Sequence, residues 1–158
     1  MHKTIVETLE KNNWKVEELS NTSKLTIYQL AIKLENSKVD TFIEISSEHC
    51  QLLIYTVCPT NVPENQRLRV SEFITRVNRG LILGNFELDF EDGELRYKSS
   101  YVFDDTLTNS GEIFLRNLYA TFNTMDKYLP GIFAVIFGNS NPHSVIMKIE
   151  KVTDPSLN

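Results

Sequence analysis

The sequence predicts an α+β protein in which helices pack on an antiparallel β-sheet, in the element order α-β-β-β-β-α-β-β-α with a possible further helix at the end. Two observations lead to this prediction. Short segments rich in β-branched and aromatic residues follow one another early in the chain, separated by turn-forming residues. Segments with helically spaced apolar residues lie before and after them and make up the last third. Separate runs of strands and helices are typical of α+β proteins.

Length and composition favour one domain that spans residues 1–158. Hydrophobic residues make up 41% and charged residues 23% of the chain, which is ordinary for a globular protein. No stretch is rich in Pro, Gly or Ser, and no repeat period is evident.

The net charge of −5 argues against nucleic acids and anionic membranes as partners, because both require a basic surface. The first residues contain no apolar stretch of signal-peptide length, and no apolar run is long enough to span a membrane. We therefore expect a cytoplasmic protein in which Cys50 and Cys58 are free thiols on buried strands.

The N-terminal third is predicted to form one helix and four strands. Residues 3–12 place Ile5, Val6 and Leu9 on one helical face. The strands are expected at residues 14–19, 25–34, 39–45 and 52–57, with polar turn residues between them. The strand at 25–34 is apolar on both faces, so it needs cover from a second layer of the chain or from a partner subunit.

A second helix is predicted to begin at Pro63-Glu64 and to end at Arg79, with Gly80 in the left-handed position that follows many helices. Its apolar stripe consists of Val70, Phe73, Ile74 and Val77.

A β-hairpin is predicted around Asp92-Gly93, a pair that favours a two-residue type I′ turn between alternating strands. Such a turn places Glu91 opposite Glu94. The register then gives the pairs Phe90 with Leu95, Asp89 with Arg96, Leu88 with Tyr97 and Glu87 with Lys98.

The final third is predicted to be helical. Asn109 is a plausible N-cap. The apolar stripe that follows consists of Phe114, Leu118, Phe122, Met125 and Leu129. Pro130-Gly131 is expected to kink or break the helix, and residues 132–137 to continue as a short apolar helix. Residues 145–152 fit a last short helix or a strand.

No pattern of catalytic, metal-binding or cofactor-binding residues is present. Residues 80–84 contain two glycines but lack the Lys-Ser/Thr of a phosphate-binding loop. The three histidines are scattered, and the acidic residues near Asp92 do not follow a calcium-binding loop pattern. Cys58 has no histidine tied to it by sequence context. We therefore expect no cofactor, no metal and no enzymatic activity.

The helix predicted at residues 64–79 is the one basic element of the chain. Its arginines are diluted by Glu64 and Glu72, which favours a solvated surface over an anion site. Arg76 and Arg79 are the candidate anion contacts on this helix.

Four short motifs occur in a characteristic order and spacing: RVNRG at 76–80, GNFELD at 84–89, DGELRY at 92–97 and YLP at 128–130. In these motifs the chain resembles the YbjN-type proteins, from about Trp14 to Gly138, and it is similar to the branch found in photosynthetic bacteria. The resemblance implies the fold of type III secretion chaperones, often as a homodimer. It implies a regulatory role and carries over no catalytic residues.

Two functional hypotheses follow, and an enzyme is the weakest third. The first is a non-enzymatic module, expected to be a homodimer, that binds a protein partner. Its candidate interaction surface consists of Phe133, Ile136 and Phe137, which belong to the apolar segment at 132–137. The alternative is a sensor of a small molecule or anion with a pocket near Arg76 and Arg79.

Overall fold

The computed structural model describes residues 2–103 and 110–153. Its helices are α1 (His2–Lys11), α2 (Arg67–Gly80), α3 (Ser110–Ile136) and α4 (Pro142–Thr153), and a short 3-10 helix, η1 (Glu64–Gln66), precedes α2. Its strands are β1 (Glu17–Asn21), β2 (Leu25–Lys33), β3 (Lys38–Ser46), β4 (Gln51–Val57), β5 (Asn85–Leu88) and β6 (Leu95–Val102). The predicted element order is confirmed, and the C-terminal segment is a helix.

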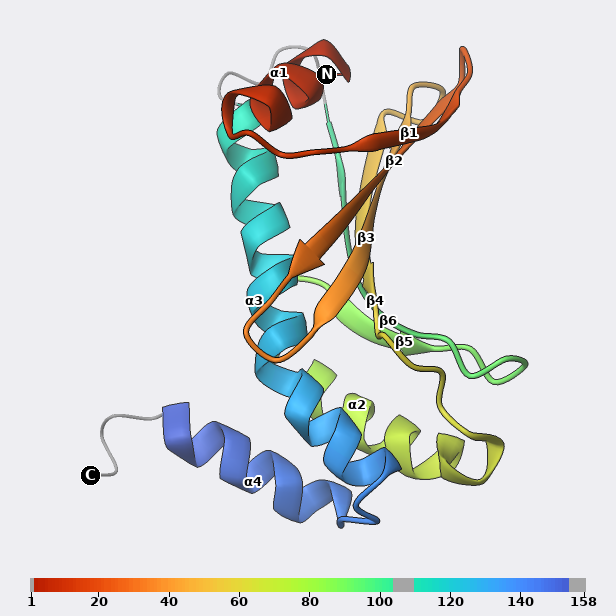
Figure 1. Ribbon diagram of the computed structural model, residues 1–158, viewed down its shortest axis with the longest axis vertical. Helices are drawn as coiled ribbons and strands as arrows, with labels where there is room; N and C mark the ends of the chain where they lie inside the picture. Colours follow the sequence, from red (N-terminus) through yellow and green to blue (C-terminus); the bar gives the residue numbers. More distant parts are fainter. Residues whose placement is uncertain (1, 104–109, 154–158) are drawn as a thin grey trace.

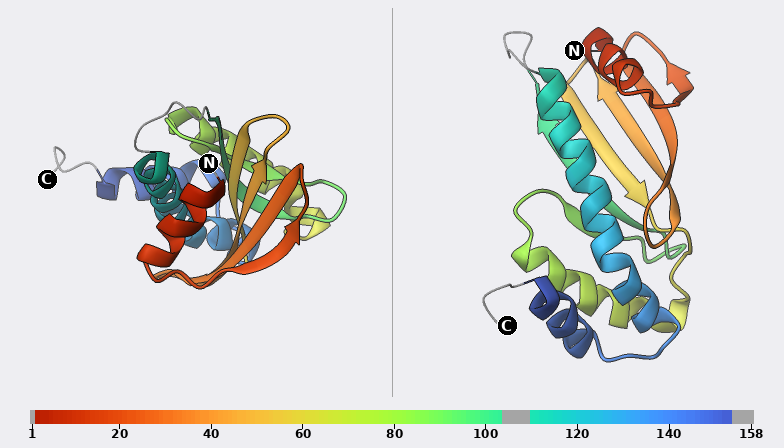
Figure 2. Two further views of the ribbon diagram at one scale, coloured as in Figure 1. Left: turned by 90° about the horizontal axis from the view of Figure 1, so that it is seen from above. Right: turned by 60° about the vertical axis from the view of Figure 1, so that its left-hand side comes forward.

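The six strands form one sheet in the order β1-β2-β3-β4-β6-β5, and all neighbouring strands are antiparallel. Figures 1 and 2 show α1 and α3 on one face of this sheet, with α2 and α4 beyond its lower end. The α+β class is therefore confirmed. The other face of the sheet carries no helix in either figure.

Helix α3 joins two hydrophobic clusters. Its N-terminal half, including Phe114 and Leu118, packs in one cluster with α1 and with strands β2, β3 and β4. Its C-terminal half, including Leu129 and Ile132, packs in the other with α2, α4, β5 and β6. Threonines 41 and 56, both fully buried, lie on the same covered face and bond to each other through their hydroxyl oxygens, 2.7 Å apart.

Of the two outcomes predicted at Pro130-Gly131, a kink or a break of the last long helix, the break is wrong, because α3 runs on to Ile136. A proline inside a helix removes the hydrogen bond to the carbonyl four residues earlier, here that of Asp126. The side chain of Asn36, in the turn between β2 and β3, donates to that carbonyl oxygen at 3.2 Å. Its backbone N–H also donates to Asp126 Oδ1 at 2.9 Å. The turn therefore satisfies the group that the proline leaves free.

Gly131 allows the same part of α3 to pack closely. A Cβ atom at this position would lie 2.6 Å from Ile149 of α4 and 2.8 Å from Phe73 of α2. Both neighbouring helices therefore approach α3 closely at the glycine, and a larger side chain at this position would push them apart.

The predicted register of the β5–β6 hairpin is wrong by two residues. Leu88 pairs with Leu95 and Glu87 with Arg96, while the loop spans residues 89–94. Asp89 N–H bonds to the Glu94 carbonyl, and the Asp89 and Asp92 side chains accept backbone N–H groups within the loop. These carboxylates stabilise a longer loop than the two-residue turn. Each side chain keeps its predicted face, but Phe90 is 48% exposed instead of buried.

Smaller differences affect the ends of elements. Strand β1 begins at Glu17, and Trp14 instead packs against Phe122 at a ring distance of 5.5 Å. Gly80 belongs to α2 and does not take the left-handed conformation. Cys50 is exposed in a turn, whereas Cys58 is buried; both thiols are free. The predicted N-cap at Asn109 lies outside the described residues.

Asn36→Ala should lower the free energy of unfolding by about 1 kcal/mol, because it removes the side-chain donor to the Asp126 carbonyl. Urea denaturation measures the loss. In a Pro130→Ala background the helix regains its own donor at residue 130, so the same Asn36→Ala change should cost clearly less. An equal cost in both backgrounds would contradict the proposed link between Asn36 and Pro130.

Candidate functional site

The candidate site is the sheet face that none of the described helices covers, called the open face below. Alternate side chains of β2, β3, β4 and β6 point away from α1 and α3. The strand register aligns them in rows across the sheet. The open face consists of Leu25, Ile27, Gln29, Ala31, Asp40, Phe42, Glu44, Ser46, Gln51, Leu53, Tyr55, Val57, Arg96, Lys98, Ser100 and Val102.

Large apolar side chains occupy the middle of the open face without being fully buried. Ile27, Phe42, Leu53 and Tyr55 are half-buried, and Val102 is 69% exposed. The strand neighbours of Ile27, Phe42, Leu53 and Tyr55 point to the covered face and are buried almost completely. Alternate side chains of β2 therefore lie in two environments: one set is in the core, and the other is on a surface where it is partly exposed to water.

An aromatic pair forms the centre of this surface. The rings of Phe42 and Tyr55 stack with centroids 5.1 Å apart, and Tyr55 donates a hydrogen bond to Glu44 at 2.8 Å. The guanidinium of Arg96 lies over the Tyr55 ring, 5.1 Å from its centroid. Burial, followed by the hydrogen bond to the Glu44 carboxylate, raises the pKa of Tyr55 well above its usual value. The phenol is therefore neutral, and the two rings present a flat, amphipathic contact area.

Charged groups form a network beside the aromatic pair. Glu87 accepts from Arg96 at 3.0 Å and also pairs with Lys98. Partial burial alone would raise the pKa of Glu87, but hydrogen bonds from Lys98, Asn85 and Arg96 together hold that pKa below its usual value. Glu87 therefore stays charged, and it fixes two basic side chains at the β6 side of the open face.

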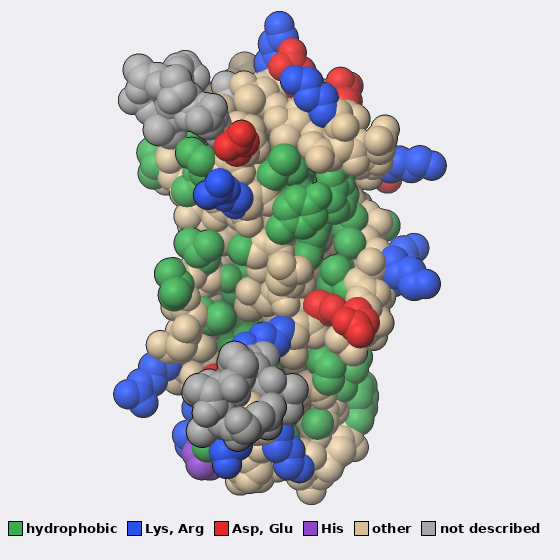
Figure 3. Space-filling view, turned by 90° about the vertical axis from the view of Figure 1, so that its left-hand side faces the viewer, with side chains coloured by type: hydrophobic (Ala, Val, Ile, Leu, Met, Phe, Trp, Pro, Cys, Tyr) green, Lys and Arg blue, Asp and Glu red, His purple; other side chains and the backbone are tan. Residues whose placement is uncertain are grey.

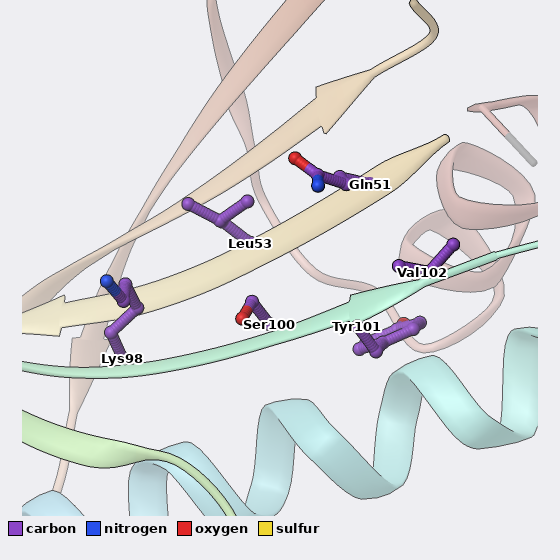
Figure 4. A pocket seen from close by; sticks show the side chains of 6 residues that line it. All are labelled: Gln51, Leu53, Lys98, Ser100, Tyr101 and Val102. Atoms are coloured by element: carbon purple, nitrogen blue, oxygen red, sulfur yellow. The ribbon is translucent and has the colours of Figure 1, made fainter. Parts of the chain in front are cut away.

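A hollow lies where β4 and β6 run side by side. Its volume is about 460 Å³, and its lining residues are Gln51, Leu53, Lys98, Ser100, Tyr101 and Val102 (Figure 4). A smaller hollow of about 190 Å³ lies beside the Glu87–Arg96 pair. The open face therefore combines apolar side chains, fixed charges and concave relief.

The predicted surface at Phe133, Ile136 and Phe137 is only partly available. Ile136 is 6% exposed and belongs to the core, so it cannot contact a partner in the folded chain. Phe137 is 68% exposed, and its ring lies 5.9 Å from that of Phe133. Helical geometry turns Ile136 inward and leaves the two phenylalanines at the end of α3.

The predicted anion contacts, Arg76 and Arg79, both lie on α2 but do not line the hollow at the C-terminal end of that helix. Arg76 pairs with Glu72 at 2.9 Å, and Arg79 is exposed. The hollow there, about 350 Å³, is lined by residues 80–83 and by α3, and includes neither arginine. Arg67 and Arg69 donate instead to backbone carbonyls of neighbouring loops.

Figure 3 views the helical side of the molecule, where hydrophobic side chains lie among charged ones and Lys and Arg gather towards the lower end. In the described part of the chain, no group of three or more His, Cys, Asp or Glu side chains is arranged to hold a metal ion. None of the helices within residues 2–103 and 110–153 is long and apolar enough to cross a membrane. Burial raises the pKa of the Cys58 thiol to about 11, which makes it a poor nucleophile.

Sequence reasoning identified the two-sided apolar character of β2 but not the site on β3, β4 and β6. The signal was present in Phe42, Leu53 and Tyr55, which interrupt the polar positions of their strands. Only the strand order shows that these residues meet, because β4 pairs with β6 across the intervening α2 and β5.

Comparison with known families gives one match that spans most of the chain. The sequence model of the YbjN family, described as "Putative bacterial sensory transduction regulator", matches residues 2–132. The chain belongs to the YbjN family. The description is that of a regulator and names no enzymatic activity. No curated protein matches the sequence.

Two solved structures share the fold of this YbjN-family chain. The crystal structure of YbjN from E. coli superposes with a TM-score of 0.61 at 14% identity, covering 85% of this chain and 90% of that one. ExsC, in the crystal structure of the ExsC–ExsE complex, gives a TM-score of 0.57 at 14% identity, covering 81% and 90%. ExsC is a type III secretion chaperone, so the fold implied by the sequence resemblance is confirmed.

Glu87→Gln should destabilise the protein near neutral pH and have less effect in acid. Since the folded state lowers the pKa of Glu87, its charged form contributes stability above the unfolded pKa of about 4.3, and this contribution is lost as the pH falls. Urea midpoints at about pH 7 and about pH 3 compare the variant with wild type. Glu91→Gln, in the exposed loop, is the control. A gap between wild type and Glu87→Gln that widens in acid would contradict the assignment.

Proposed function

We propose that this YbjN-family protein is a non-enzymatic, regulatory binding module whose open face receives a segment of a partner polypeptide. The observation that carries the proposal is the set of half-buried apolar side chains, Ile27, Phe42, Leu53 and Tyr55, on a sheet face that no layer of residues 2–103 and 110–153 covers. Exposed apolar area of this kind on a folded protein is most often an interaction surface.

The chemistry of the open face fits a polypeptide better than a small polar metabolite. The stacked pair Phe42–Tyr55 offers a rigid contact area at low entropic cost. Arg96 is already held by Glu87 and by the Tyr55 ring, so it can contact a partner with little loss of freedom. Aromatic residues and arginine are also the residue types that contribute most to protein interfaces.

The comparison with ExsC adds support at the level of the fold. That protein, which shares this fold, was crystallised in complex with a protein partner, ExsE. At 14% identity the likeness concerns the backbone alone, so the contact residues are argued here from the open face of this chain.

Phe133 and Phe137 form a second exposed apolar site, at the end of α3. We propose it as an accessory contact, because it is small and lacks the charged groups that flank Phe42 and Tyr55. A homodimer through either apolar surface is a competing use of the same side chains.

Photo-crosslinking in the native cell tests the proposal. A photoreactive phenylalanine analogue at Phe42 should give discrete adducts with a partner polypeptide, whereas the same analogue at Tyr119 on α3 should give few. Phe137 is the demanding control, because it is far more exposed than Phe42. Adducts at Phe137 with none at Phe42 would move the binding surface to the helix end and contradict the proposal. Adducts of Phe42 with only a second copy of the chain would do the same.

A further inference from the structure

Strand β6 is longer than the edge strand that pairs with it. β5 pairs with residues 95–98, whereas β6 continues to Val102 and pairs with β4 over its second half as well. Along residues 99–102, the edge away from β4 has no neighbouring strand among the described residues. The edge of the sheet therefore shifts from β5 to β6 at residues 99–102, and this unpaired part of the β6 edge is called the step.

The backbone groups that point into this step can be assigned from the ladder. Leu95 and Phe103 bond towards the β4 side, to Cys58 and Cys50 respectively. In an antiparallel strand the direction of the N–H and C=O groups alternates from residue to residue. Ser99 and Tyr101 therefore bond towards β4, while Ser100 and Val102 point their N–H and C=O groups into the step.

The outer edge of β5, by contrast, is already closed. Asn78 of α2 accepts the N–H of Phe86 at 2.8 Å and donates to its carbonyl at 3.0 Å, so its side-chain amide imitates a neighbouring strand. At the far side of the sheet, β1 is short and interrupted by a bulge after Glu18. Both features are common protections of sheet edges, and the step at Ser100 and Val102 has neither of them.

The step opens into the hollow of about 460 Å³ between β4 and β6. That hollow is lined by Leu53, Lys98, Ser100 and Val102, whose side chains lie on the open face, and by Tyr101, whose side chain lies on the α3 side. Figure 4 shows Tyr101 extending towards α3, away from Gln51 and Leu53. The hollow thus reaches around the edge of β6. It leaves room beside Ser100 and Val102, both of which are exposed.

We propose that the free edge of β6 at residues 99–102 is a strand-addition site, where an extended segment of the partner polypeptide pairs with Ser100 and Val102. This inference rests on the proposed function and specifies how the partner is held. Main-chain hydrogen bonds supply affinity, and alternate side chains supply specificity. The segment places apolar side chains in the hollow beside Leu53 and Val102, and its remaining length continues over Phe42 and Tyr55.

A partner segment fits this edge better than a second copy of the chain. Pairing of two β6 edges would involve only four residues from each copy. A stable interface needs about 800 Å² from each partner, far more than a contact of that length provides. An extended segment gains the missing area by crossing the open face.

Amide hydrogen exchange in the free protein is the first test. The amides of Ser100 and Val102 should exchange quickly, because no strand among the described residues pairs with them, while those of Ser99 and Tyr101 should be protected by β4. Protection of Ser100 and Val102 in the free monomer would overturn the proposal, since the edge would then be occupied already.

The second test uses Ser100→Pro, with Ser100→Ala as the matched control. Proline removes the outward N–H but leaves the β4–β6 ladder intact, whereas Ser99→Pro would break that ladder and unfold the edge. Melting temperatures should confirm that Ser100→Pro remains folded. Peptides selected from a random dodecapeptide library on wild type should bind Ser100→Ala normally and Ser100→Pro at least about tenfold more weakly.

The outcomes separate the inference from the proposed function. Peptides that bind Ser100→Pro as well as wild type, yet lose affinity for Phe42→Glu, would overturn strand addition and keep the open face as the site. Failure of every peptide to bind wild type would count against the proposed function itself. A wild-type dimer that Ser100→Pro converts to a monomer in sedimentation would assign the edge to a second copy and overturn the inference.

Discussion

The continuity of α3 through Pro130 is the constraint on which the rest of the molecule depends. This helix contributes buried side chains to both hydrophobic clusters, and so connects the cluster that contains α1 with the cluster that contains α2 and α4. Its proline costs one intrahelical hydrogen bond. Asn36, contributed by the sheet, bonds the freed carbonyl. Helix and sheet are thereby fixed to each other at the point where the helix is weakest.

Helices α1 and α3 cover one face of the sheet, and no described helix covers the other. The chain folds with a complete core on the covered face, so the open face does not need its apolar side chains for burial. Their presence there, together with charges that are already paired, is the basis for the recognition role proposed for the open face. The same one-sided design leaves the step in β6 accessible, since α2 closes the edge only at β5.

Much of the fold could be predicted from sequence because its elements are encoded locally. The apolar stripe from Phe114 to Leu129 correctly predicted a helix and its buried face. The alternation at residues 25–57 did the same for three strands. The failures arose where a distant or polar group intervened. Asn36 cannot be connected to Pro130 from spacing alone, and the Asp89 and Asp92 side chains lengthened a loop that Asp-Gly suggested was tight. The open face was missed because only the strand order shows that β4 and β6 are neighbours. Ile136 was expected at an interaction surface but is buried, although the next residue, Phe137, is exposed.

Hydroxyl-radical footprinting, read by mass spectrometry, tests the central claim most directly. The account predicts that Phe42, Leu53, Tyr55 and Val102 are oxidised in the free protein. Tyr97 on the covered face and Phe114 on α3, both buried, should not be oxidised. When a selected peptide is bound, the open-face residues should become protected and Tyr119 on α3 should not change. Protection of the open face in the free monomer, or binding that leaves its oxidation unchanged, would contradict the account.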